Sequence, residues 1–362
     1  MRTGTADLPL HGGRAPRWLF ERMTLLARAM TLAILENEGI PGFMRRLADP
    51  VWFQAFGCVL GFDWHSSGLT TTACGALKEG LRELSNETGL YVAGGKGKTS
   101  RKTPQEIETA CWALGRDPDG LTRASRLSAK VDSAAVQDGF QVYHHSFFFS
   151  ADGAWAVVQQ GMNEGSGMAR RYHWLPPAHF DSDPHAAIAG ARTQQVLNLV
   201  ASEGNANRQL AVQLAREKPM TVVSELSKMR SVAMPRHHAI SLADLHPERL
   251  SRILLSTYER QPEDYTALLG TPGVGAKALR ALALVAELTY GEPASVRDPV
   301  SYAFAHGGKD GTPFPVDRTT YDATIDSLRR AVGDAHAGHS EKTAALKRLA
   351  GVEASLLATA GA

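Results

Sequence analysis

Apolar residues recur at helical spacing along most of the chain, and only one short region has the pattern of β-strands. In the first half this spacing predicts an amphipathic helix over Trp18–Glu36, because apolar positions three and four residues apart share one helix face. From Leu210 to the C-terminus the same spacing predicts an almost wholly helical part. Further helices of the first half are expected at Gly42–Leu60, Thr71–Ser85, Pro104–Leu114 and Leu121–Val131.

Two neighbouring segments carry the signal for strands. Phe140–Ser150 is rich in aromatic and β-preferring residues, and Ala154–Met162 contains the run Trp-Ala-Val-Val. Between them stands Asp152-Gly153, a pair of residues that favours the tight turn of a β-hairpin. The sequence therefore predicts one antiparallel hairpin in a mainly helical first half.

The register of this hairpin depends on the length of its loop. If the turn centres on Asp152-Gly153, His145 faces Gln160; if the loop has three residues, His144 faces Gln160 and His145 faces Gln159. Either register places a histidine beside a glutamine, with Cβ atoms about 5 Å apart. Such neighbours form hydrogen bonds in many sheets, so each pair alone is also consistent with a structural role.

The distribution of residue types divides the chain into two parts. All six tryptophans and all three cysteines precede residue 175, whereas the remainder is rich in Ala, Leu, Arg and Glu. We place the boundary in the polar stretch Pro184–Arg208, which gives domains 1–195 and 196–362. The expected fold class is mostly α (α+β): a helical N-terminal domain with a small sheet, and an all-helical C-terminal domain with a helix-hairpin-helix element at 262–292.

The charge of the chain is nearly balanced, with 39 basic and 37 acidic residues and a net charge of +2. A protein coated with positive charge is thereby excluded, so any contact with nucleic acid must come from local patches and backbone amides. One such patch is the glycine-rich segment Gly94–Lys102, which we expect to form a flexible basic loop.

The cellular location is expected to be the cytoplasm. Three widely spaced cysteines, Cys58, Cys74 and Cys111, form no CxxC pair and no disulfide framework, which favours a reducing compartment. The apolar run Trp18–Ile34 contains charged residues and is not a membrane span, and Met1–Gly13 does not have the pattern of a signal peptide.

The segment TALLGTPGVGAKALRALALVAELTYGEP has the pattern of two helices joined by a glycine-rich turn. Gly273 and Gly275, on either side of Val274, permit a tight turn and the close approach of another molecule to the backbone. The amides at the start of the second helix then suit a phosphate group. DNA is the expected partner and RNA is not excluded, while a generic turn between two helices is the alternative.

This Pro-Gly-Val-Gly turn resembles the helix-hairpin-helix motif of DNA repair proteins, and in particular of DNA glycosylases. The resemblance implies that Lys277 is the amine that attacks the sugar anomeric carbon and forms a Schiff base. It also implies that Asp317, in Pro315-Val316-Asp317, places a negative charge opposite the developing oxocarbenium ion. However, forty residues separate Lys277 from Asp317, about twice the family's usual spacing. Either the loop has grown by insertion, or Asp317 only caps a helix and Lys277 only contacts phosphate.

The first half contains a second set of candidate residues. Its acids, histidines and glutamine form an alternative acid–base site or a site for a divalent metal, although no recognised metal-binding spacing occurs among them. Arg170 and Arg171, near Tyr172 and Trp174, fit a phosphate contact flanked by aromatic rings that stack on bases. The residues of the alternative site are Asp63, His65, Asp132, His144, His145, Gln160 and His173.

Several segments along nearly the whole chain are similar to an uncharacterised family known as domain of unknown function 763. They are LPLHGGRAPRWLFERM, WFQAFGCVLGFDWHSSG, KVDSAAVQDGFQVYHH, WAVVQQGMN, ARRYHWL and FAHGGKDGTPFPVDR. This resemblance implies membership of that family and brings no activity with it.

Taken together, these features predict a DNA-processing enzyme, with a repair glycosylase or abasic-site lyase as the leading class. The alternatives are a metal-dependent nuclease or phosphodiesterase with its site in the N-terminal domain, and a DNA-binding accessory protein without catalysis. No cofactor other than a divalent metal is expected, and the sequence does not indicate a protein partner.

Overall fold

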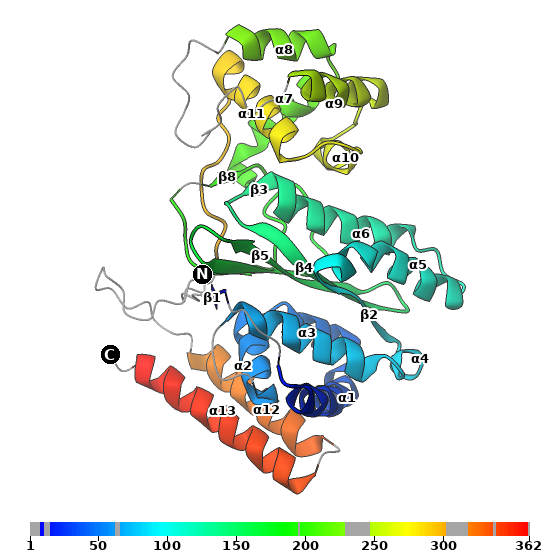
Figure 1. Ribbon diagram of the computed structural model, residues 1–362, viewed down its shortest axis with the longest axis vertical. Coiled ribbons are helices and arrows are strands. Elements are labelled where there is room, and N and C mark those ends of the chain that lie inside the picture. The colour runs from blue at the N-terminus through cyan, green and yellow to red at the C-terminus, as the bar shows by residue number, and fades with distance from the viewer. Residues whose placement is uncertain are drawn as a thin grey trace.

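A computed structural model describes residues 8–10, 15–61, 66–194, 196–228, 247–301, 318–335 and 338–360. An antiparallel sheet lies in the middle of the molecule, with helices on both of its faces (Figure 1). Its strand order is β1 (Leu8–Pro9), β6 (Met168–Trp174), β5 (Trp155–Asn163), β4 (Gln141–Ser150) and β2 (Leu90–Lys96), and β7 (Ala187–Ala189) also pairs with β6.

The central hairpin, β4–β5, adopts the second of the two predicted registers. His144 pairs with Gln160, and His145 pairs with Gln159. The ladder closes at Ser150, whose N–H donates to the carbonyl oxygen of Ala154 at 2.9 Å, so the loop contains three residues. Gly153 in this loop has a φ of 94°, a conformation that glycine adopts without strain.

The first face of the sheet is covered by helices from both ends of the chain. α1 (Arg17–Leu47), α2 (Pro50–Leu60) and α3 (Ser67–Leu81) share one apolar core with α12 (Arg318–Asp334) and α13 (His339–Ala360). Leu328 and Leu349 are buried in this core, and Arg348 donates to the carbonyl oxygen of Val59 at 2.8 Å. The predicted boundary at residue 195 stays a prediction, but the last two helices return to the N-terminal layer.

The helix expected over Gly42–Leu60 is divided in two. α1 bends at Gly39, whose φ is 67°, and ends at Leu47. The carboxylate of Asp49 then accepts the backbone N–H groups of Val51 and Trp52, and Pro50 occupies the first position of α2. An aspartate cap followed by proline is typical of a new helix start, and this local signal outweighs the continuous apolar pattern.

The second face of the sheet is covered by α5 (Thr103–Ala113) and α6 (Asp119–Lys130) (Figure 1). α6 continues into one turn of π-helix, η2 (Val131–Ala135), and the segment expected as a loop forms a 3-10 helix, η1 (Gly97–Lys102). The remaining elements are α4 (Ser85–Thr88), β3 (Val136–Gln137), β8 (Leu197–Asn198), η3 (Ser202–Gly204), α7 (Asn205–Ala215), α8 (Pro219–Lys228), α9 (Pro247–Arg260), α10 (Tyr265–Gly270) and α11 (Ala276–Tyr290).

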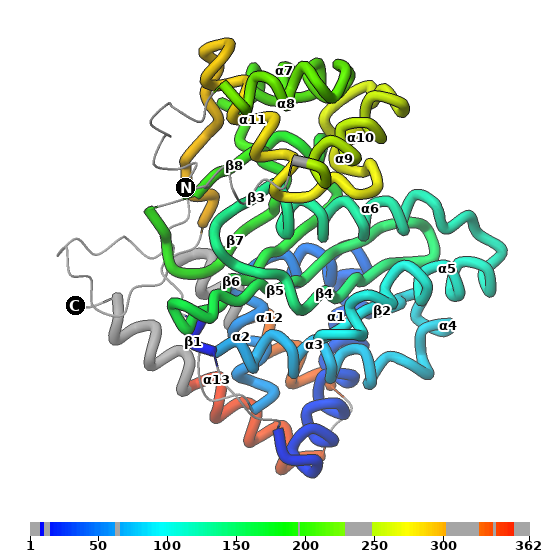
Figure 2. The backbone as a smooth tube through the Cα atoms, turned by 45° about the horizontal axis from the view of Figure 1, so that its top comes forward, coloured from blue at the N-terminus to red at the C-terminus, as the bar shows by residue number. Residues whose placement is uncertain are grey.

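Helices α7 to α11 form a group beyond α6, and their apolar residues continue the core of the second face (Figures 1 and 2). The two-stranded β3–β8 ladder joins this group to the end of α6. The described part of the chain is thus mainly helical, with a small antiparallel sheet and a two-stranded ladder, which confirms the predicted mixed α+β class. Among the described helices, none combines the length and apolar character that a membrane span requires.

Candidate nucleic-acid interface

The glycine-rich turn joins α10 to α11 as the sequence predicts. Asp264 caps the start of α10, since its carboxylate accepts the N–H of Ala267 at 2.7 Å. Val274 is buried and fixes the turn against the core, whereas Gly273 is exposed with a φ of 86°. Only glycine adopts this conformation without strain, so the sequence and the turn agree at this position.

The start of α11 has no side-chain cap, in contrast to the start of α10. Gly275 is the N-terminal capping residue of α11, and no side chain caps this end of the helix. Among the residues that the structure describes, none beyond its own chain neighbours would lie within 4 Å of a Cβ atom placed on Gly275, so this part of the protein leaves space beside it. Lys277 is exposed in the first turn of the helix. Amides, helix dipole and a lysine therefore meet at one accessible point.

Gln137 attaches this turn to the rest of the molecule. Its side-chain amide donates to the carbonyl oxygens of Ala134 and Ala276, at 2.9 Å each, and its amide oxygen accepts the Nε–H of Arg280. Burial lowers the pKa of Arg280. No local pattern indicates this role of Gln137, because the two ends of its contact with Ala276 lie 139 residues apart.

The described residues of the alternative N-terminal site lie on opposite faces of the sheet. Asp132 and His145 are on the α6 side, where Gln159 stands between them: Gln159 accepts from His145 Nδ1 at 2.8 Å and donates to the Asp132 carboxylate. Asp132 also accepts the indole N–H of Trp174 at 3.0 Å and contacts His185. His145 completes this network through its Nε2, which is 2.9 Å from the hydroxyl of Ser125.

On the face toward α1 and α3, Gln160 occupies the centre of a second network. Its amide oxygen accepts the hydroxyl of Thr70 at 2.5 Å, and its amide nitrogen donates to the hydroxyl of Tyr143 and to the carbonyl oxygen of Ser67. His144 Nε2 lies 3.1 Å from the hydroxyl oxygen of Ser146. Both side chains are buried on the face that α3 covers.

The buried histidines are held in their neutral form. Burial, together with the charges of His145 and Lys96, lowers the pKa of His144 to about 3. Burial and the nearby Arg171 also lower the pKa of His173, whose Nδ1 lies 2.7 Å from the carbonyl oxygen of Leu47. His144, His145 and His173 are each less than 5% exposed. They are closed off from solvent, whereas a side chain that exchanges a proton with a substrate must be within its reach.

The sheet therefore separates the set that the sequence grouped together. Asp132 and His145 face α6, and Gln160, His144 and His173 face the other layer. Asp63 and His65 lie outside the described residues. Within the described ranges, no three of the histidine, cysteine and acidic side chains gather as metal ligands.

Arg170 and Arg171 do not fit the predicted phosphate contact, because both side chains are fully buried. Arg170 bridges two carboxylates, Asp138 at 2.8 Å and Asp298 at 2.9 Å, and lies over the ring of Phe140. Arg171 points to the opposite face, where it donates to Gln54 at 3.2 Å. Burial lowers the pKa of Arg171 to about 10, so it is still charged at neutral pH.

Of the predicted catalytic pair, Lys277 and Asp317, the structure describes only Lys277. Lys277 lies on α11, in the part of the chain that the structure describes, and its side chain interacts with other residues of the protein. Asp317 lies outside the described residues. The proposed proximity of the amine and the carboxylate thus stays a prediction.

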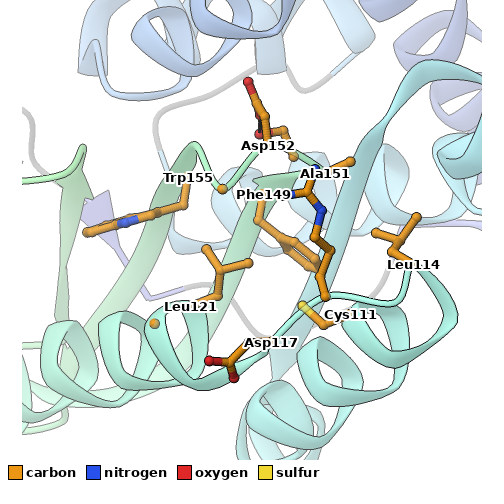
Figure 3. A pocket seen from close by; sticks show the side chains of 12 residues that line it. Cys111, Leu114, Asp117, Leu121, Phe149, Ala151, Asp152 and Trp155 are labelled. Atoms are coloured by element: carbon orange, nitrogen blue, oxygen red, sulfur yellow. Dashed lines mark hydrogen bonds between the residues drawn. The ribbon is translucent and has the colours of Figure 1, made fainter.

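A pocket of about 370 Å³ lies at the tip of the β4–β5 hairpin (Figure 3). Phe149, Trp155 and Leu121 line it, and Asp117 lies on the α6 side (Figure 3). Cys111 also lines it, but burial and the charge of Asp117 raise the pKa of this thiol. At neutral pH the sulfur is therefore protonated and is a poor nucleophile.

The fold and the exposed turn define the chain as a mixed α+β protein in which a glycine-rich surface turn joins α10 to α11. The model of the family described as "Protein of unknown function (DUF763)" matches residues 4–316. The chain belongs to this family, as its sequence motifs indicated. No curated protein and no solved structure is significantly similar to it.

Proposed function

We propose that this protein binds the sugar–phosphate backbone of DNA through the α10–α11 turn. The observation that carries the proposal is the start of α11, which no side chain caps and beside which Gly275 leaves open space. A phosphate oxygen placed there accepts hydrogen bonds from the first amides of the helix. It also gains from the dipole, which is equivalent to about half a positive charge at the helix N-terminus.

Lys277 adds a full positive charge to this point. It is exposed in the first turn of α11, two residues after Gly275. Because the net charge of the whole chain is only +2, the binding energy must come from such local contacts rather than from a general positive field. We therefore expect a modest dependence of affinity on salt, corresponding to few neutralised phosphates.

The test is the substitution Gly275→Val. Gly275 has an extended backbone, with φ −138° and ψ −176°, and its Cβ direction is open, so valine fits the fold. Its side chain occupies the space that a phosphate needs, and we expect the affinity for a 20-base-pair duplex to fall at least tenfold. Gly333→Val is the matched control, because a Cβ on Gly333 also meets open space but Gly333 belongs to α12. Equal affinities of wild type and Gly275→Val would disprove the proposal.

A second candidate function, a glycosylase or abasic-site lyase, is favoured by the accessible place of Lys277 beside the proposed phosphate. In this reaction the neutral amine adds to the C1′ aldehyde of an abasic site, water leaves, and an imine forms that borohydride reduces to a stable amine. Wild type should then give a covalent protein–DNA product with borohydride, also in the presence of chelator.

The variants Lys277→Arg and Lys277→Ala separate binding from chemistry. Arginine keeps the positive charge but forms no Schiff base, so we expect Lys277→Arg to bind DNA and give no product with borohydride. Lys277→Ala should give no product and should also bind more weakly. If Lys277→Arg is trapped as efficiently as wild type, Lys277 is not the nucleophile. Activity that chelator abolishes would instead indicate a metal-dependent nuclease.

A further inference from the structure

The segment between β2 and α5 carries a dense group of positive charges. Residues 96–102 have the sequence KGKTSRK, with four basic and no acidic residues. Its four cationic side chains are all exposed. They belong to Lys96, Lys98, Arg101 and Lys102, which we call the η1 cluster.

The backbone under this cluster is held firmly. Gly94 has a φ of 87°, and a Cβ there would overlap the carbonyl oxygen of His145, so only glycine fits. Lys78 donates to the carbonyl oxygen of Gly94 at 2.8 Å and to Glu106 at 2.6 Å. Glu106 in turn accepts the N–H of Gly94 at 2.8 Å. The segment predicted as a flexible loop is therefore built as a defined turn.

The charges of the η1 cluster are not neutralised by the described part of the protein. Within those residues, none of its four side chains forms an ion pair with a carboxylate. Lys96 lies 5.8 Å from the ring centre of Tyr143. Glu106, in the first turn of α5, is already paired with Lys78. Lys98, Arg101 and Lys102 lie on one turn and repel one another, and an anionic partner relieves this repulsion.

η1 leads into α5, which lies on the same side of the sheet as the α10–α11 turn, whereas Lys96 pairs with His144 and lies over Tyr143 on the face toward α3. α5, which starts directly after η1, packs beside α6, and α6 packs against α10 (Figure 1). Between them, Arg123, Arg126 and Lys130 follow one another at intervals of three and four residues along α6, which places them on one helix face. Arg126 has only a loose partner, Glu108 at 3.8 Å.

We propose that the η1 cluster is a second contact for the DNA backbone, and that duplex DNA runs across α6 from this cluster to the α10–α11 turn. The inference rests on the proposed DNA binding. α5 and α10 each pack against α6, and packed helices are about 8–10 Å apart, so α5 and α10 are at most about 20 Å apart. Because phosphates follow each other at about 3.4 Å along each strand, about 20 Å corresponds to about six nucleotides.

The experiment is phosphate ethylation interference on a 20-base-pair duplex. Wild type should show two separate groups of essential phosphates. The triple variant Lys98→Gln/Arg101→Gln/Lys102→Gln should lose one group and keep the other, whereas Gly275→Val should lose the opposite group. For each phosphate that is no longer neutralised, the slope of log affinity against log salt should become shallower by about 0.9.

The control removes the same charge elsewhere. Arg17→Gln/Arg22→Gln/Arg45→Gln lies on α1, in the helix layer on the other face of the sheet, and should leave both phosphate groups and the salt slope unchanged. The inference is overturned if the η1 triple variant behaves like this control. If wild type binds no DNA at all, the proposed function itself fails. If wild type binds DNA but shows only the phosphate group at the α10–α11 turn, the proposed function stands and the second contact is disproved.

Discussion

The α10–α11 turn and the polar rows of the central sheet contain residue types found in functional sites, but their surroundings differ. Against one face of the sheet, Asp132 of η2 accepts hydrogen bonds from Gln159 and Trp174 and contacts His185, and Arg170 of β6 lies between Asp138 and Asp298. At the turn, the start of α11 has no side-chain cap and faces open space.

This comparison shows which polar groups are available for binding. A buried polar group that the protein already satisfies stabilises the fold, because leaving it unpaired costs about 1–3 kcal/mol. A set of amides that the protein leaves to solvent can exchange water for a ligand without that cost. The kind of residue is thus a weaker guide to function than the partner it already has.

The largest expected effect is on stability, at Arg170. Arg170→Ala leaves the buried carboxylates of Asp138 and Asp298 without their cation, and we expect a loss of about 3–5 kcal/mol in the free energy of unfolding. Arg22→Ala, an exposed position on α1, should change it by about 0.5 kcal/mol or less. Denaturation in urea measures both. If Arg170→Ala were as stable as wild type but bound DNA more weakly, Arg170 would be a binding residue rather than a structural one.

The next effect is on the pH dependence of stability. The pKa of His144 is lowered to about 3 in the fold, below the usual histidine value of about 6.5 in the unfolded chain. Between these values the unfolded state binds the proton and the folded state does not, so stability falls as pH falls from about 6.5. His144 alone contributes about 1.4 kcal/mol per pH unit there.

His144→Gln should flatten this dependence by up to one proton, measured as the free energy of unfolding from pH 7 to pH 4. Replacement of the exposed His339 by Gln is the control, since its surroundings are open. An unchanged slope in His144→Gln would mean that His144 is accessible to solvent and that helices do not close this face of the sheet.

The smallest expected effect on stability is at the turn itself. Gly275→Val, which should weaken DNA binding strongly, should change the free energy of unfolding by about 1 kcal/mol or less, since glycine is only a modestly favoured helix cap. The same urea experiment measures it. A large destabilisation would mean that Gly275, like the buried residues of the sheet, has a structural role rather than a role in binding.

Local signals in the sequence predicted much of the fold. The aromatic and β-branched residues of β4 and β5 predicted the hairpin, and the two glycines on either side of Val274 predicted the turn before α11. By contrast, the end of β2 was interpreted as a loop because Gly94 and Gly95 are poor strand formers, and β6 was missed because its arginines and histidine are rarely buried.

The candidate site was predicted in part. The sequence identified Gly273, Gly275 and Lys277 because they are close together in the chain and their backbone requirement is local. It grouped Asp132, His144, His145 and His173 as one site, although adjacent strand residues such as His144 and His145 point to opposite faces. It also missed Gln137 and His185, whose partners are distant in sequence.

The helical spacing, the hairpin with its two alternative registers and the α10–α11 turn can be read from the sequence, because each depends on residues a few positions apart. The covering of both sheet faces by helices, and the return of α12 and α13 to α1 and α2, follow from contacts between distant segments. That closure buries Arg170, Arg171 and the histidines of β4 and β6, while Lys277 and the η1 cluster stay exposed. Burial is a property of contacts between distant segments, and no local pattern contains it.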